Sequence, residues 1–252
     1  MLLDLVRAKT GLHTHALVES TLNFPIGTGI ASSAAGFAAL ALAATTAAGL
    51  DLVEQELSRL ARRGSGSACR SIPGGFVDWL PGESDETSFA FSFAPPDCWD
   101  LVDVIVVLQS KPKKIGSREG HTFASTSPLQ AARIADAPRR LQICREAIFH
   151  KDFGNLAEII ELDSNMMHAV MMTSSPSLQY WEAGSISLMR AVPCWRAEGL
   201  QVAYTLDAGP NVHLICAKED VPSVKERVLE ISKPAHIFIS GVGGPARIVK
   251  TV

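Results

Sequence analysis

Residues 23–36 read Asn-Phe-Pro-Ile-Gly-Thr-Gly-Ile-Ala-Ser-Ser-Ala-Ala-Gly and lead directly into an alanine-rich segment, residues 37–50. The alanine-rich segment predicts a helix that begins at or just after Ser32 and Ser33. Small residues let the backbone approach a ligand closely, and a helix N-terminus presents unpaired N–H groups to it. The pattern favours phosphate binding, with the two serine hydroxyls available to phosphate oxygens or to a magnesium shell.

The same stretch has a second interpretation. It lacks the Gly-Lys-Ser/Thr ending of a Walker-type phosphate loop, and a single glycine-rich loop is a weak signal. A tight strand-to-helix turn that is closely packed for structural reasons alone would show the same small residues. Composition by itself leaves both interpretations open.

The composition of the 252-residue chain excludes several classes of protein. Hydrophobic residues make up 47%, enough for a sizeable core, and a formal net charge of −3 gives no basic surface for nucleic acid. No apolar stretch is long enough to span a bilayer, and an acid interrupts the apolar start of the chain, unlike in a signal peptide. Five scattered cysteines without a Cys-x-x-Cys pair indicate neither a disulfide framework nor a zinc site. We therefore expect a cytoplasmic globular protein that binds neither nucleic acid nor membranes.

Hydrophobic periodicity predicts a chain in which helices and strands alternate. Asp51 and Glu54 are expected to form a capping box, Pro193 to interrupt its helix, and residues 113–121 to form a polar loop. The predicted helices are 1–10, 37–50, 52–63, 127–151, 156–171, 178–197 and 221–230, and the predicted strands are 16–24, 76–80, 102–108, 201–206, 212–216 and 235–240.

Two charged residues stand out at predicted loops. Residues 64–75 read Gly-Ser-Gly-Ser-Ala-Cys-Arg-Ser-Ile-Pro-Gly-Gly, and the neighbours of Arg70 are too small to cover it. A guanidinium in this setting suits a bidentate anion, although the stretch also fits an ordinary flexible linker. Asp207 follows a predicted strand and precedes a glycine turn, where a carboxylate can face a cleft. An ordinary turn aspartate is the alternative there.

Four stretches of the sequence carry a combined signal: residues 23–25 with 29–36, 61–71 with 74–76, 163–165 with 168–169, and 204–211. Together, and in the same order along the chain, they resemble the mevalonate diphosphate decarboxylases of the GHMP kinase superfamily. This superfamily also holds galactokinase, homoserine kinase, mevalonate kinase and phosphomevalonate kinase. The resemblance implies an α/β fold, an α+β two-layer sandwich of the GHMP-kinase-like type. Its N-terminal half would be ribosomal protein S5 domain 2-like and its C-terminal half ferredoxin-like. It implies an ATP-binding domain over about residues 1–100, incomplete at its start, and a second domain over 101–252.

The resemblance also implies an activity. Such enzymes use ATP and Mg²⁺ to decarboxylate mevalonate 5-diphosphate to isopentenyl diphosphate, carbon dioxide, ADP and phosphate, in the mevalonate pathway of isoprenoid biosynthesis. They are commonly homodimers, and a homodimer is expected here.

The family's functional residues transfer to positions of this sequence that match its motifs. Asp207 matches the catalytic aspartate, and Arg70 matches the arginine that holds the substrate carboxylate. Ser33 is the candidate magnesium ligand, in addition to a role in binding the ATP phosphates. The implied ATP-phosphate residues are Gly29, Ile30, Ala31, Ser32, Ser33 and Ala34, and the implied substrate-binding residues are Ser65, Ser67, Arg70, Ser117 and Arg118.

Two departures from the family keep other functions open. Family members usually carry a further N-terminal section with a Tyr/Trp-Gly-Lys motif, so we expect this chain to lack that section. His121 stands where several diphosphate-using relatives carry Met. The alternatives are a phosphomevalonate or bisphosphomevalonate decarboxylase, a mevalonate 3-kinase, and an inactive truncated fragment that only binds nucleotide.

Overall fold

The computed structural model describes residues 2–26, 29–109 and 117–249, and it leaves the side chains of residues 117–119 undescribed. The chain forms two compact units. The first contains Met1–Ile26, Ala31–Cys98 and Val242–Val252, and the second contains Gly27–Ile30 and Trp99–Gly241. The glycine-rich stretch therefore changes from one unit to the other immediately before the alanine-rich helix.

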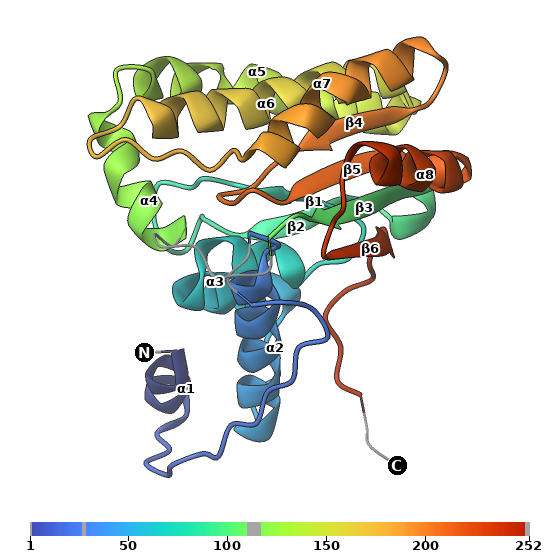
Figure 1. Ribbon diagram of the computed structural model, residues 1–252. Helices are drawn as coiled ribbons and strands as arrows, with labels where there is room; N and C mark the ends of the chain where they lie inside the picture. The colour runs from blue at the N-terminus through green and yellow to red at the C-terminus, as the bar shows by residue number, and fades with distance from the viewer. Residues whose placement is uncertain (1, 27–28, 110–116, 250–252) are drawn as a thin grey trace. The chain divides into compact units, whose positions relative to one another are not determined.

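The first unit packs helices with a two-stranded antiparallel sheet (Figure 1). Its core is built largely from alanine and leucine, and small side chains let its elements approach closely. A Cβ on Gly64 would lie 2.2 Å from the Phe37 ring, so glycine is required where these two helices meet. The elements are α1(Leu2–Thr10), α2(Ser32–Ala47), α3(Glu54–Gly64), the 3-10 helices η1(Gly66–Ser71) and η2(Pro96–Cys98), β1(Phe76–Trp79) and β2(Ala90–Ala94).

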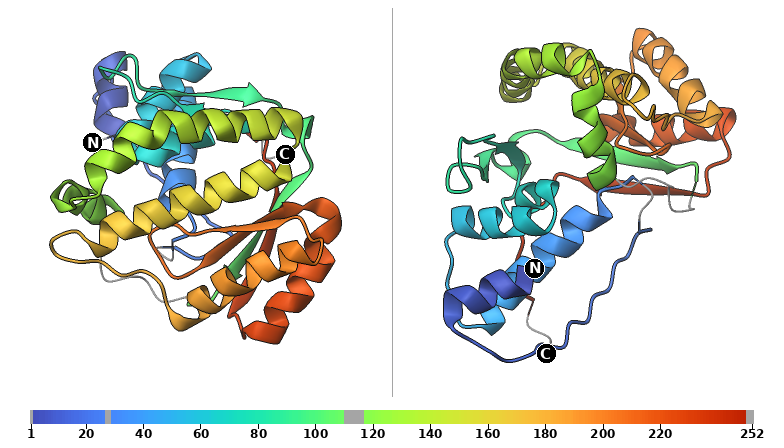
Figure 2. Two further views of the ribbon diagram at one scale, coloured as in Figure 1. Left: turned by 90° about the horizontal axis from the view of Figure 1, so that it is seen from above. Right: turned by 90° about the vertical axis from the view of Figure 1, so that its left-hand side faces the viewer.

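The second unit contains a four-stranded antiparallel sheet in the order β4-β5-β3-β6. Helices α5 and α6 run side by side in both views of Figure 2. The described elements are β3(Leu101–Val107), α4(Ser117–Phe123), η3(Ala124–Thr126), α5(Gln130–His150), α6(Phe153–Met172), α7(Ala183–Ala197), β4(Val202–Thr205), β5(Val212–Ala217), η4(Lys218–Asp220), α8(Val221–Ile231) and β6(His236–Gly241).

The two faces of this sheet differ because successive residues of a strand point to opposite sides. Val104 and Leu214 form a register pair and belong to a fully buried cluster with Leu188 of α7 and Val224 of α8. The odd-numbered positions of β3 face the other way and include a carboxylate, Asp103. One face of the sheet is thus a hydrophobic core, and the other carries polar groups.

Helices α5 and α6 are joined by a buried charge. Only 5% of Arg140 is exposed, and its guanidinium lies 2.8 Å from Asp136 on its own helix and 3.0 Å from Asp163 on α6. Two carboxylates and the Arg133 carbonyl satisfy its donors, which a buried guanidinium requires. Asp163, a polar position of the family motif, therefore has a structural contact.

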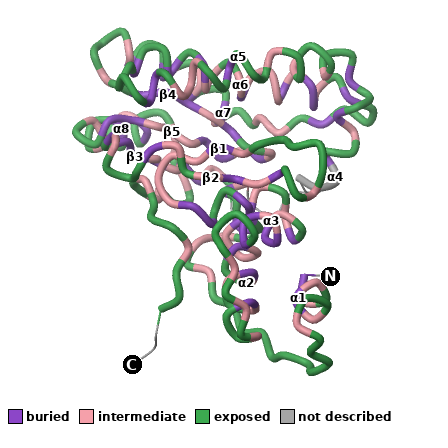
Figure 3. The backbone as a smooth tube through the Cα atoms, turned by 180° about the vertical axis from the view of Figure 1, so that it is seen from behind, coloured by how far each residue is buried: buried purple, intermediate pink, exposed green. Residues whose placement is uncertain are grey.

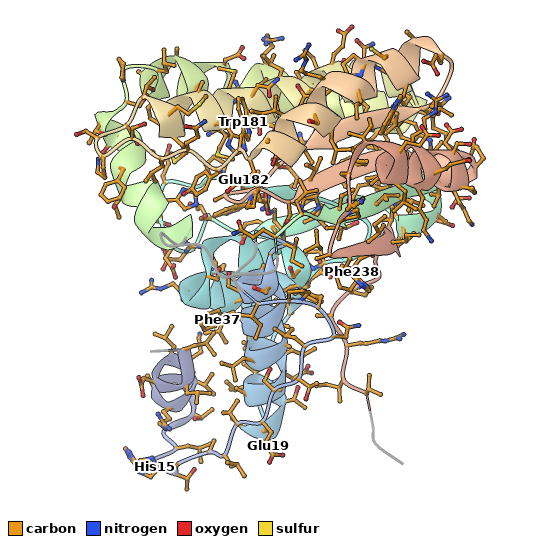
Figure 4. All side chains as sticks on the ribbon, viewed as in Figure 1. His15, Glu19, Phe37, Trp181, Glu182 and Phe238 are labelled. Carbon is orange, nitrogen blue, oxygen red and sulfur yellow. The ribbon has the colours of Figure 1, made fainter. Side chains whose placement is uncertain are left out.

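Most predicted elements are confirmed, including the helix that begins at Ser32 and the strands on either side of Asp207. The predicted strand 16–24 is wrong. It alternates in sequence, but no described strand pairs with it, and most of it is exposed (Figure 3). Figure 4 labels Glu19 on this segment and His15 immediately before it. Alternation alone does not form a strand when its backbone groups have no partner.

Other predictions from local sequence signals were also wrong: the capping box, the helix interruption at Pro193 and two predicted loops. Helix α3 begins at Glu54 with Val53 at its N-cap, so Asp51 forms no capping box. Pro193 lies inside α7 without ending it, because its neighbours Val192 and Trp195 are buried in the core. The stretch expected to be a flexible loop contains η1, and the last part of the predicted polar loop is helix α4; residues 113–116 lie outside the described residues.

Membrane association through a spanning helix has no support in the described part of the chain. No helix there combines the length and the apolar character that crossing a bilayer requires.

The fully buried Ser58 of α3 gives a test of the packing in the first unit. Its hydroxyl donates to the Cys69 carbonyl at 3.1 Å and accepts from the Ala90 N–H at 2.9 Å. Ser58→Ala leaves both groups buried without this partner, and we expect it to lower the free energy of unfolding by about 1–3 kcal/mol. Urea unfolding measures the loss. Ser92→Ala, at an exposed position of β2, is the control and should change stability by less than about 0.5 kcal/mol. Equal unfolding midpoints for the two variants would contradict the prediction.

Candidate functional site

The start of α2 has the features of an anion site. Ala31, its N-cap, has a φ of 58° in the left-handed region, which is unfavourable for a residue with a Cβ. No side chain caps this helix end. Ser33 is exposed, and its hydroxyl lies 3.2 Å from the hydroxyl of Ser65. Two hydroxyls therefore stand together beside the positive end of a 16-residue helix.

Helix η1 presents Arg70 to solvent. Ala68 and Cys69 are fully buried and anchor the helix, whereas Arg70 is exposed and Ser67 is half-buried. Among the described residues, Arg70 forms no ion pair, so its guanidinium is available to an external anion. Burial raises the pKa of the Cys69 thiol despite the nearby Arg70 charge, so this cysteine is a neutral packing residue.

Asp207 occupies a fixed turn at the end of β4. The preceding residue, Leu206, donates its N–H to the Ser164 hydroxyl at 3.0 Å, and its carbonyl lies 3.2 Å from Nε2 of His168. The N–H of Gly209 donates to the Asp207 carbonyl at 2.7 Å. The backbone on both sides of Asp207 is therefore held, while its side chain remains exposed.

The far side of this turn is held by buried polar side chains. Ser185 of α7 donates to the Pro210 carbonyl at 2.6 Å. The Asn211 side chain, in a residue only 1% exposed, accepts hydrogen bonds from the N–H groups of Leu108 at 2.9 Å and Gln109 at 3.1 Å. These contacts tie the turn to α7 and to the end of β3, and they give Asn211 of the family motif a physical role.

His168 acts in this arrangement as a neutral donor. Burial lowers its pKa to about 4, against the opposing effects of the Leu206 carbonyl and the Asp207 charge. Its ring packs near Trp181, with ring centroids 5.0 Å apart, and near Tyr180 at 6.0 Å. The Leu206 carbonyl requires a proton on Nε2, so the hydrogen bond fixes the tautomer.

Gly29 approaches the Asp207 turn within the second unit. A Cβ at Gly29 would lie 3.1 Å from the Gly209 Cα, and the φ of Gly29 is +85°. The positive φ would strain a residue with a Cβ, and the close approach leaves little room for one, so both features favour glycine here. Ile30 is buried, and Ala34 belongs to the hydrophobic core of the first unit. Packing therefore anchors the residues that follow Gly29.

The structure assigns the predicted site residues to both units. Ser65, Ser67 and Arg70 belong to the first unit with Ala31, Ser32, Ser33 and Ala34, whereas Gly29, Ile30 and Asp207 belong to the second. Within the first unit, the hydroxyls of Ser33 and Ser65 lie 3.2 Å apart and join two of these residues directly. Ser117 and Arg118 open α4 in the second unit, and their side chains lie outside the described residues.

Sequence analysis missed one pair of charged residues in the second unit. Nδ1 of His213 on β5 lies 2.8 Å from a carboxylate oxygen of Asp103 on β3. The only available signal was a polar residue at one position of each predicted strand. The register that joins the two strands could not be known from the sequence.

A cavity of about 250 Å³ in the first unit is separate from these residues. It is lined by Leu5, Ala8, Lys9, Glu56, Arg59, Leu60, Arg63 and Asp85, and none of these is a predicted site residue.

The groups at the start of α2 suit a phosphate with its magnesium ion. No group of three or more His, Cys, Asp or Glu side chains placed to hold a metal occurs among the described residues. A magnesium ion here would take oxygen ligands from hydroxyls, phosphate and water, as Mg²⁺ commonly does in nucleotide sites. The uncapped start of α2 with the hydroxyls of Ser33 and Ser65 offers such ligands.

Comparison with protein families gives two matches that together cover most of the chain. Residues 1–90 match the diphosphomevalonate decarboxylase-like N-terminal domain, and residues 103–244 match the mevalonate 5-diphosphate decarboxylase C-terminal domain.

Curated relatives carry related names. The diphosphomevalonate decarboxylase of Aspergillus fumigatus is 41% identical over 86% of this chain and 55% of its own length. The phosphomevalonate decarboxylase of Haloferax volcanii is 33% identical over 98% of this chain and 75% of its own length. The chain spans about half the length of the first of these relatives.

Solved structures share the fold. Mevalonate diphosphate decarboxylase from Staphylococcus aureus superposes with a TM-score of 0.91 at 35% identity, covering 99% of this chain and 76% of that one. A structure of MDDEF in complex with MVAPP, AMPPCP and magnesium has a TM-score of 0.89 at 39% identity, covering 97% of this chain and 75% of that one. The predicted α/β fold of the GHMP-kinase type is thereby confirmed. By both family matches and by these relatives, the chain belongs to the diphosphomevalonate decarboxylase family.

Proposed function

We propose that this protein catalyses the ATP- and magnesium-dependent decarboxylation of mevalonate 5-diphosphate to isopentenyl diphosphate, carbon dioxide, ADP and phosphate. The observation that carries the proposal is the Asp207 turn. An exposed carboxylate follows a buried strand, and the backbone on either side of it is fixed by hydrogen bonds. Relatives that share this fold bear the name of this activity.

Each charged residue has a role that the chemistry requires. A tertiary hydroxyl is a poor leaving group, and in this reaction it departs as a phosphate while the neighbouring carboxylate is lost as carbon dioxide. Asp207 would accept or orient the hydroxyl proton and then face the positive charge that develops on the tertiary carbon. Arg70, exposed and without an ion pair among the described residues, would hold the carboxylate bidentately.

The start of α2 would hold the nucleotide phosphates. Ser32, Ser33 and the backbone from Gly29 to Ala34 would bind phosphate oxygens, and Ser33 is the proposed magnesium ligand, with Ser65 beside it. ATP would supply the phosphoryl group that makes the tertiary oxygen a leaving group. Ser67, Ser117 and Arg118 complete the proposed contacts to substrate.

A second candidate is the decarboxylation of mevalonate 5-phosphate. The relative from Haloferax volcanii that carries the name phosphomevalonate decarboxylase aligns with almost the whole chain. His121 of α4 is exposed, and it stands at a position where the substrate's phosphates are expected. The two candidates share Asp207 and Arg70 and differ in the number of phosphates that are bound.

The proposal also covers the oligomeric state and the cellular compartment of the protein. We infer a homodimer, as in the family. The five cysteines are free thiols, which supports a reducing, cytoplasmic compartment.

Asp207→Asn tests the catalytic assignment. The amide keeps the size of the side chain but cannot accept the hydroxyl proton as a carboxylate does, so we expect kcat to fall by at least about 100-fold. Because Asp207 is exposed, the unfolding midpoint should be unchanged. Asp51→Asn, an exposed acid outside the proposed site, is the matched control and should retain wild-type turnover. A folded Asp207→Asn protein with wild-type kcat would show that the assignment is wrong.

Release of carbon dioxide from mevalonate 5-phosphate and 5-diphosphate, each with ATP and Mg²⁺, separates the two candidates. We expect kcat/KM to be higher for the diphosphate, because its second phosphate offers further charged contacts to the site. A preference for the monophosphate would establish the second candidate instead. A thermal shift with ATP but no turnover of either compound would identify a protein that only binds nucleotide.

A further inference from the structure

The outer edge of strand β4 is covered by side chains in place of another strand. Among the described strands, β4 pairs with β5 alone. On its other edge, backbone groups of Val202, Tyr204 and Leu206 form hydrogen bonds with side chains of α6 and α7. An open strand edge would leave such groups to water or to another chain. The two helices therefore satisfy the edge that leads to Asp207.

The contacts along this edge fall into two groups, and the group farther from Asp207 is an ion pair. Arg196 of α7 donates to Glu161 of α6 through two hydrogen bonds of 2.8 and 3.1 Å. Arg196 also donates to the Val202 carbonyl at 2.8 Å, and Glu161 accepts a hydrogen bond from the Tyr204 N–H at 3.3 Å. This group joins the two helices to β4 itself.

The group nearer to Asp207 consists of two neutral side chains of α6, those of Ser164 and His168. The Ser164 hydroxyl accepts from the Leu206 N–H at 3.0 Å and donates to the Leu206 carbonyl at 3.4 Å. Nε2 of His168 lies 3.2 Å from the same carbonyl oxygen. Because residues four apart on a helix lie on one face, both backbone groups of Leu206 are held by a single face of α6.

The bound carbonyl belongs to the peptide unit that joins Leu206 to Asp207. This unit is planar, so fixing its oxygen also restricts the position of the Asp207 Cα. Ser164 and His168 are only 4% and 1% exposed. The His168 ring also packs against Trp181, with ring centroids 5.0 Å apart (Figure 4 labels Trp181). The two side chains that hold this peptide unit are therefore themselves held by the core.

We propose that Ser164 and His168 are positioning residues for Asp207, which set the place of its carboxylate by fixing the peptide unit between Leu206 and Asp207. The inference rests on the proposed function of Asp207. Both side chains act through the backbone, and neither has an assigned contact with the substrate. The competing explanation is that all the contacts along this edge, including those of Glu161, only cover β4 and stabilise the fold.

Steady-state kinetics of variants in the two groups distinguishes these explanations. His168→Leu removes the donor to the Leu206 carbonyl, and Ser164→Ala removes the hydroxyl. We expect kcat to fall by about 10- to 100-fold in each, with KM changed by less than about twofold, because a displaced carboxylate slows the reaction while the phosphate contacts remain. His168→Gln, whose amide can still donate, should recover most of the loss.

Glu161→Gln is the matched control, because it removes the charge of the ion pair on the same edge. It should lower the urea unfolding midpoint and keep the wild-type kcat. Folded His168→Leu and Ser164→Ala proteins with the wild-type kcat would overturn the inference. It would also be overturned if Glu161→Gln lost as much kcat as these two variants, or if His168→Gln recovered none of the loss.

Amide hydrogen exchange followed by NMR decides the inference without any need for turnover. The N–H of Gly209 donates to the Asp207 carbonyl and therefore reports on this turn. We expect it to exchange at least about tenfold faster in His168→Leu and Ser164→Ala than in the wild-type protein, and at the wild-type rate in Glu161→Gln. Unchanged exchange of Gly209 in the first two variants would contradict the positioning role. A wild-type chain without turnover would contradict the proposed function, whereas the exchange rates would still decide this inference.

Discussion

The hydrogen bonds between Leu206 and helix α6 are the constraint on which the proposed chemistry depends. Leu206 is the last buried residue before an exposed carboxylate, and both its N–H and its C=O are bound by side chains of α6, those of Ser164 and His168. Because a strand end normally leaves such groups to water, these contacts fix where the strand stops. The position of Asp207 follows from them. His168 can serve only as a neutral donor, and its burial ensures that state.

In the first unit, buried polar contacts also position an exposed charged residue, Arg70. Arg70 is exposed, but it follows two fully buried residues, and the backbone of its short helix is tied to α3 through the carbonyl of Cys69 and the hydroxyl of Ser58. Because the backbone is already fixed, only the Arg70 side chain has to be ordered when it binds an anion. In both units, buried polar contacts therefore position the exposed charge.

Much of this could be predicted from the sequence because it depends on local pattern. The alanine-rich helix, its start at Ser32 and the carboxylate at a strand end all follow from periodicity and from glycine. The predicted strand 16–24 failed because pairing depends on a neighbour that periodicity does not specify. The His213–Asp103 contact depends on the register between strands far apart in the chain, and no local signal carries that information.

The proposal that Asp207 and Arg70 act on one substrate molecule is tested most directly by a crystal structure of this protein with mevalonate 5-diphosphate and a non-hydrolysable ATP analogue. We expect the substrate carboxylate to contact the Arg70 guanidinium while the tertiary hydroxyl of the same molecule lies within hydrogen-bonding distance of Asp207. A bound substrate that touches only one of these two side chains, with the other remaining in solvent, would contradict the proposed mechanism.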